Sequence, residues 1–202
     1  MIRSVKKLLL NRSRAAWYNP MKSDLWTTSL RTVYDKAITL YRDGQRGDTT
    51  YFSSEETEFL ASIGLRPINV YDYVEDFISA GEPDWETYLL IVAVRRHYFI
   101  FEQTCLGSLE EIRPDELPAK RVTLAGIPWL PRIIKKATCF LEGALCHDIM
   151  YGCGGDRHFL REHRLHPADF LQAVWLANGD DQKILSFMRD WETGPSRQHL
   201  SS

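Results

Sequence analysis

Apolar residues recur at steps of three and four along most of the chain, which is the period of an amphipathic helix. The pattern predicts eight helices, at about 23–42, 54–63, 70–80, 85–102, 130–145, 157–162, 167–178 and 181–191. Ser53 and Glu56 form a capping box, and His166 followed by Pro167 has the pattern of a helix start. The other side chains expected to cap helices are Asn69, Asp84, Asp156 and either Asp180 or Asp181.

Two stretches are open to more than one interpretation. Residues 85–102 are apolar on all sides and also fit a buried strand, although their length favours a helix. Residues 104–126 have no period and contain two glycines and two prolines. This composition indicates a long irregular connection, with a hairpin at 121–124 as the alternative.

A chain of 202 residues with 44% hydrophobic and 26% charged residues has the composition of a folded protein. At this size a hydrophobic core forms without disulfides. We therefore expect an all-α protein of about eight helices. Its expected parts are a basic arm at 1–22, one compact helical domain at 23–193 with its candidate seam at 104–126, and a polar tail at 194–202.

Charge is distributed unevenly along the chain, although the net charge is only −2. Residues 1–23 hold six basic side chains and no acid, residues 55–94 hold nine acids against one arginine, and residues 118–164 are basic again. The low net charge disfavours nucleic acid as a partner. The basic arm itself can dock on the chain's own acidic middle, on a neighbouring subunit or on nucleic acid.

The four cysteines, at 105, 139, 146 and 153, follow no spacing typical of a secreted disulfide framework. We expect them to be reduced and the protein to be cytoplasmic. No export signal follows the basic N-terminal residues, and the most apolar run, 88–94, is too short to cross a bilayer. The sequence therefore predicts no membrane association.

The segment Tyr151–Arg157 carries three glycines around one thiol and leads into a helix start. Glycines permit close approaches and unusual backbone angles, and free N–H groups at a helix start favour anions and the thiolate form of cysteine. Cys153 is therefore the candidate nucleophile, with Asp148 or Asp156 as base or orienting group and Tyr151 as a polar donor. In the alternative interpretation Cys153 is a small buried side chain in a tight turn.

Arginines supply the candidate anion-binding residues. Arg95 and Arg96 end the most hydrophobic predicted helix, where an unpaired guanidinium is costly to bury. They are expected to reach solvent, or to pair with a carboxylate or an anionic ligand; the carboxylates considered are Glu86, Asp148 and Asp156. Arg157, next to the Cys153 loop, is a third candidate for binding an anionic group.

Seven potential metal ligands fall within 28 residues, namely Cys139, Cys146, His147, Cys153, His158, His163 and His166. They follow none of the spacings of known zinc sites, and Gly143 is expected to break the helix between the first two. We therefore predict no metal site. The residue pattern does not identify a cofactor.

Several motifs are long enough to be compared with known families. The two most specific are YGCGGDR at 151–157 and HPADF at 166–170, and the others are LASIG at 60–64, VEDF at 74–77, GEP at 81–83, AVRR at 93–96 and WLPRII at 129–134. Together, over about residues 55–190, they resemble a bacterial family known only as a domain of unknown function. The resemblance implies that the Cys153 loop, Arg95, Arg96 and the segment beginning at His166 are family features, which makes His166 a candidate ligand-binding residue; it implies no reaction.

These observations predict a small-molecule enzyme or ligand-binding protein whose site, at the Cys153 loop, takes an anionic group. The alternative is an accessory or adaptor protein that binds another protein, or a second copy of itself, through its acidic helices or basic arm. A cavity at Cys153 with Asp and Arg side chains converging on it would favour the first prediction.

Overall fold

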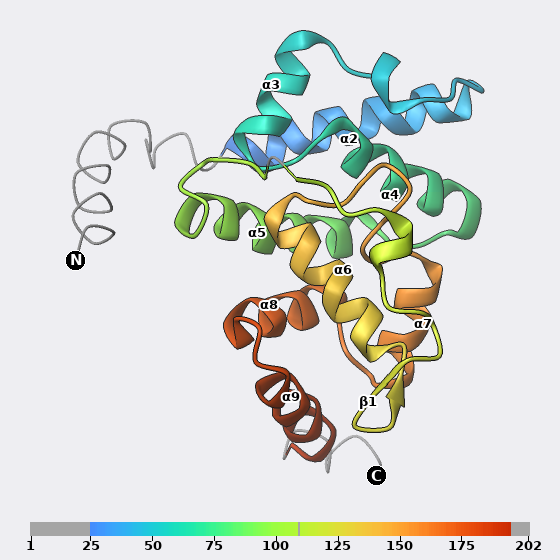
Figure 1. Cartoon of the computed structure of the whole chain (residues 1–202). Coiled ribbons are helices and arrows are strands. Elements are labelled where there is room, and N and C mark those ends of the chain that lie inside the picture. The colour runs from blue at the N-terminus through green and yellow to red at the C-terminus, as the bar shows by residue number, and fades with distance from the viewer. Residues whose placement is uncertain (1–24, 109, 195–202) are drawn as a thin grey trace, which may run out of the picture.

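The computed structural model describes residues 25–108 and 110–194 and contains eight α-helices in that part of the chain (Figure 1). The helices are α2 (Trp26–Arg42), α3 (Ser54–Ser62), α4 (Pro67–Ala80), α5 (Trp85–Phe101), α6 (Leu130–Glu142), α7 (Gly154–Glu162), α8 (Pro167–Ala177) and α9 (Asp181–Thr193). Two 3-10 turns, η2 (Asp48–Thr50) and η3 (Pro114–Glu116), and two short strands, β1 (Thr123–Leu124) and β2 (Ile127–Pro128), complete the order. The all-α prediction is confirmed. The predicted arm lies outside the described residues, as do all residues of the predicted tail except Gly194.

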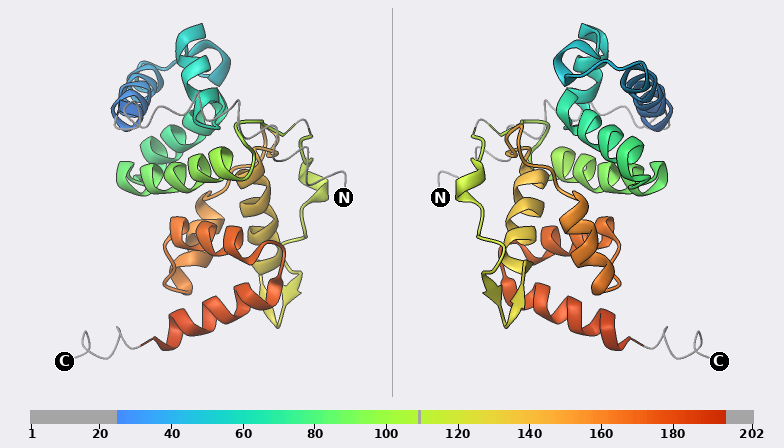
Figure 2. Two further views of the ribbon diagram at one scale, coloured as in Figure 1. Left: turned by 90° about the vertical axis from the view of Figure 1, so that its left-hand side faces the viewer. Right: turned by 90° about the vertical axis from the view of Figure 1, so that its right-hand side faces the viewer.

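The helices are arranged from one end of the molecule to the other in roughly the order of the chain. All views place α2 and α3 at one end and α9 at the opposite end, with α5 and α6 between them (Figures 1 and 2). α2 packs on α4, α5 packs on both α6 and α8, and α8 packs on α9. The elements that bear the candidate site are therefore brought together near the middle of the molecule.

Most predicted helix starts are found where the sequence placed them. The Ser53 hydroxyl accepts a hydrogen bond from the backbone N–H of Glu56, whose carboxylate accepts one from the N–H of Ser53. Asp84 caps α5, His166 caps α8, and Asp180 caps α9. These local side-chain contacts satisfy backbone donors that the helix itself leaves unpaired.

Two helices begin earlier than predicted. α4 begins at Pro67, and Asn69 lies inside its first turn, where its side chain accepts a hydrogen bond from the N–H of Arg66. α7 begins at Gly154 with Cys153 in the capping position. Asp156 is therefore in the first turn of α7, and its side chain folds back into the protein.

The two stretches with more than one interpretation, 85–102 and 104–126, have definite structures. Residues 85–101 form a helix with Tyr88, Ile91 and Val92 fully buried. The connection before α6 is mostly irregular, and β1 and β2 pair in it as a minimal antiparallel hairpin. Both interpretations of the connection therefore describe part of it, with the hairpin displaced toward α6.

Candidate functional site

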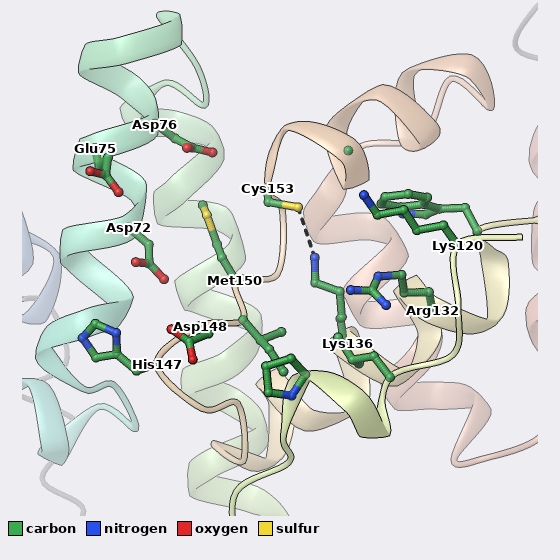
Figure 3. A pocket seen from close by; sticks show the side chains of 15 residues that line it. Asp72, Glu75, Asp76, Lys120, Arg132, Lys136, His147, Asp148, Met150 and Cys153 are labelled. Carbon is green, nitrogen blue, oxygen red and sulfur yellow. Dashed lines mark hydrogen bonds between the residues drawn. The ribbon is translucent and has the colours of Figure 1, made fainter.

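A cavity of about 430 Å³ opens beside the Cys153 loop, between α4, α6 and the connection that precedes α6 (Figure 3). Its lining residues are Asp72, Glu75, Asp76, Pro114, Leu117, Lys120, Trp129, Arg132, Lys136, His147, Asp148, Ile149, Met150, Cys153 and Gly155. The volume lies within the usual range for small-molecule sites. Two predicted site residues, Cys153 and Asp148, line this cavity.

The turn before Cys153 depends on Gly152. Its φ of 80° is in the left-handed region, and a Cβ atom there would lie 3.2 Å from the Tyr73 hydroxyl oxygen. That hydroxyl donates a 2.6 Å hydrogen bond to the backbone oxygen of Tyr151. Tyr73 is fully buried, so the core itself fixes the position of the loop.

Asp156 is a fully buried carboxylate behind the loop. It accepts hydrogen bonds from the indole N–H of Trp129 at 3.0 Å, from Lys136 Nζ at 2.5 Å and from the backbone N–H of Gly152 at 3.0 Å. Asp156 thus accepts hydrogen bonds from three donors and holds these neighbours in place. Its side chain has no exposed surface and is shielded from the cavity.

Lys136 is the residue that Asp156 orients. Its side chain is 5% exposed, and its Nζ also donates to Cys153 Sγ at 3.1 Å (Figure 3). Lys136 is a site residue that was not expected from the sequence. The available signal was its position three residues after Ile133 and four before Phe140, on the buried face of the amphipathic helix.

Gly155 explains a further part of the glycine-rich motif. A Cβ atom at this position would lie 2.6 Å from the ring of Trp129, so the indole packs directly on the backbone of α7. Trp129 precedes α6 and has a left-handed φ of 68°. The contact aligns α6, which carries Lys136, with the start of α7, which carries Asp156.

Basic side chains form one wall of the cavity. Lys120 Nζ lies 5.6 Å from the centre of the Trp129 ring, and the Arg132 guanidinium lies 6.0 Å from it. Arg132 also donates to the backbone oxygen of Pro118 at 2.9 Å. Together with Lys136, these residues present three cations on one side of the cavity (Figure 3).

Carboxylates form the opposite wall, which sequence analysis did not assign to a site. Glu75 accepts a hydrogen bond from the Tyr41 hydroxyl at 3.0 Å, and Asp76 accepts one from Arg157 at 2.6 Å. Asp72 accepts no hydrogen bond from the described residues, and burial raises its pKa to about 7.

Neighbouring charges also act on the pKa of Asp72. Glu75, Asp76 and Asp48 also raise the pKa of Asp72, while His147 opposes the rise. His147 Nε2 lies 3.0 Å from Asp48 Oδ1, and this contact raises the pKa of the imidazole. The acidic wall therefore contains a mostly buried carboxyl group, and the histidine that acts on its pKa is already paired with another aspartate.

Three predicted site residues contribute to structure near the cavity without lining it. Arg157 is buried and donates to Asp76 and to the backbone oxygen of Gly152, which ties α7 to α4. Tyr151 is buried and its hydroxyl donates to the backbone oxygen of Pro167 at 2.7 Å. His166 Nδ1 accepts from the N–H of Ala168 at 3.2 Å. Arg157 and His166 border a second cavity of about 550 Å³.

The structure does not bring Arg95 and Arg96 to the Cys153 cavity. Arg95 is buried, donates to Gln103 Oε1 at 2.8 Å, and has its pKa lowered to about 10 by burial. Its hydrogen-bonding partner is thus an amide and none of the three carboxylates considered, because this end of α5 faces the turn that follows it. The Arg96 guanidinium lies 5.1 Å from the centre of the Trp26 ring.

The described residues contain neither a cluster of metal ligands nor a membrane-spanning helix. Among residues 25–108 and 110–194, no group of three or more His, Cys, Asp or Glu side chains is placed to hold a metal ion. No helix in the same part of the chain is long and apolar enough to cross a membrane. All four cysteines are free thiols.

Comparison with known proteins adds no assignment. The family inferred from the YGCGGDR and HPADF motifs stays a prediction. No family model matches this sequence, and comparison with curated proteins and with solved structures gave no match.

Proposed function

We propose that this protein is a small-molecule enzyme or binding protein that takes an anionic group into the Cys153 cavity, with Cys153 as the nucleophile. The observation that carries the proposal is the 3.1 Å contact between Lys136 Nζ and Cys153 Sγ at a cavity that also holds Arg132 and Lys120. A buried ammonium beside a thiol and two more cations nearby form an arrangement suited to negative charge.

Each residue has a distinct part in this proposal. Cys153 supplies the sulfur, and the Lys136 ammonium stabilises negative charge on it. Asp156 holds Lys136 in place through the buried ion pair and acts as a positioning residue. Arg132 and Lys120 attract the anionic group of the ligand.

Two alkylating reagents of different charge test the proposal. Iodoacetate is an anion and iodoacetamide is neutral, and both transfer their carbon to a thiolate with loss of iodide. We expect the iodoacetate-to-iodoacetamide rate ratio at Cys153 to exceed that of the free uncharged thiol N-acetylcysteine amide by about 10-fold or more. Mass spectrometry of the alkylated peptides measures the rate at each cysteine.

Matched variants show which side chains cause the preference of Cys153 for iodoacetate. Arg132→Gln and Lys120→Gln should lower the ratio at Cys153, whereas Lys183→Gln, which removes an exposed charge on α9, should leave it unchanged. Equal ratios at Cys153 and at the free thiol would overturn the proposed anion site.

The adaptor alternative has less support. Several acidic side chains between 55 and 94 already pair within the chain: Glu56 with Lys36, Asp76 with Arg157, and Glu82 with Arg161. These charges are partly neutralised and contribute less to a docking surface. Binding through the basic arm, assembly with a second copy, bacterial origin and a cytoplasmic location stay predictions.

A further inference from the structure

The Cys153 cavity has two walls of opposite charge. In Figure 3 the carboxylates of α4 lie on one side, with Asp148 and His147 below them, and Lys120, Arg132 and Lys136 lie on the other. A site built only for an anion would gain nothing from carboxylates on its opposite wall, because they repel the ligand. The acidic wall therefore needs an explanation of its own.

The carboxylates that line the cavity differ in whether they already have a hydrogen-bond or ion-pair partner within the protein. Asp76 is paired with Arg157, and Glu75 accepts a hydrogen bond from Tyr41. Asp72 and Asp148 line the same cavity and accept no hydrogen bond from the described residues. Asp72 is mostly buried, so its negative charge is costly unless a cation approaches it.

The space between the walls is less polar. Met150 and Cys153 lie there in Figure 3, and Ile149 and Leu117 also line the cavity. A methylene chain can pack against such side chains while its two ends reach the charged walls.

We infer that the ligand is a small molecule with a primary ammonium group at one end and an anionic group at the other, the ammonium being bound by Asp72 and Asp148 across the cavity from Arg132 and Lys120. This inference rests on the proposed function, which supplies the anionic end. The ammonium donates hydrogen bonds to the two free carboxylates, and the chain between the two ends passes Met150. A ligand with only one of the two charges satisfies one wall and meets repulsion at the other.

A matched series of probes tests the inference on the full chain. The probes are 4-aminobutanoate and 6-aminohexanoate, the carboxylates butanoate and hexanoate, and the amines butylamine and hexylamine. Isothermal titration calorimetry at pH 8 should show at least one amino acid binding about 10-fold or more tightly than both of its single-charge counterparts.

Substitutions separate the two walls. Asp72→Asn should weaken the amino acid about 10-fold and leave binding of the matched carboxylate unchanged, whereas Arg132→Gln should weaken both. Asp190→Asn, an exposed aspartate on α9, is the matched control and should change neither. Circular dichroism confirms that each variant is folded.

The outcomes distinguish this inference from the proposed function. If a carboxylate binds in an Arg132-dependent way and the added amine gives no gain, the inference is overturned and the proposed function stands. If no probe binds and iodoacetate also shows no preference for Cys153, both are overturned. An equal loss of affinity for amino acid and carboxylate in Asp72→Asn would likewise overturn the role given to the acidic wall.

Discussion

Lys136 and Asp156 form an ion pair in which Nζ and Oδ2 lie 2.5 Å apart, and neither side chain is more than 5% exposed. The two residues are 20 positions apart and join the middle of α6 to the first turn of α7. The same ammonium contacts the sulfur of Cys153. One buried charge thus serves both the packing of two helices and the electrostatics of the cavity.

Removing one member of this pair should be costly. Asp156→Ala leaves a buried ammonium unpaired and is expected to lower the free energy of unfolding by about 3 to 5 kcal/mol. Urea denaturation measures the change. The double variant Lys136→Met with Asp156→Asn should lose less than the sum of its two single variants, because the pair is removed as a unit; additive losses would argue against direct coupling.

Two adjacent glycines should respond differently to alanine. Gly155→Ala places a Cβ 2.6 Å from the Trp129 ring and should lower the free energy of unfolding by about 1 to 3 kcal/mol. Gly154→Ala places its Cβ 3.8 Å from the nearest atom, on Arg157, and should be neutral within about 0.5 kcal/mol. Thermal denaturation of both variants checks this, and similar losses would show that Trp129 does not pack as described.

Asp72 should make stability depend on pH. Its pKa of about 7 in the folded protein is above the ordinary value of 3.8, so folding takes up a proton between these pH values. The free energy of unfolding therefore falls as pH rises from about 4 to about 7. Asparagine does not ionise, and Asp72→Asn is expected to stabilise the fold by about 1 to 3 kcal/mol at pH 8.

The pH series contains its own control. At pH 4 the wild-type carboxyl is protonated, and the difference between Asp72→Asn and wild type should nearly vanish. Asp190→Asn, with an exposed side chain, should follow wild type at both pH values. A stabilisation of Asp72→Asn that is equal at pH 4 and pH 8 would show that ionisation is not its cause.

The cysteines should differ in reactivity. Cys153 borders the cavity, whereas Cys139 is 1% exposed and burial raises the pKa of its thiol. We expect Cys153 to react with iodoacetamide at neutral pH about 10-fold or more faster than Cys139. Lys136→Met should slow Cys153 and leave exposed Cys105 unchanged; an unchanged rate at Cys153 would remove the role given to the lysine.

Local signals in the sequence were sufficient for most of the fold. Ser53, Asp84 and His166 cap helices because the groups they satisfy lie within three residues of them. The start of α7 was misplaced because Asp156 has the chemistry of a cap, yet its carboxylate is drawn inward by Trp129 and Lys136, which are distant in sequence.

The site was predictable only where one segment carries the signal. Cys153 stands out through the glycines around it, and Lys136 had a weaker signal on the apolar face of α6. The carboxylates of α4 carry no sequence signal for a site, because an acidic helix face usually points to water. Arg95 was a reasonable candidate by chemistry, but the packing of α5 directs it to Gln103.

The pairing of Arg157 with Asp76 spans 81 positions of the sequence. As the chain is synthesised, α4 is completed before the Arg157 guanidinium, which pairs with Asp76 once α7 has formed. One carboxylate of an early helix thus depends on a late segment of the chain for its ion-pair partner. A fragment that ends before residue 157 would leave Asp76 without the guanidinium that pairs with it in the folded chain.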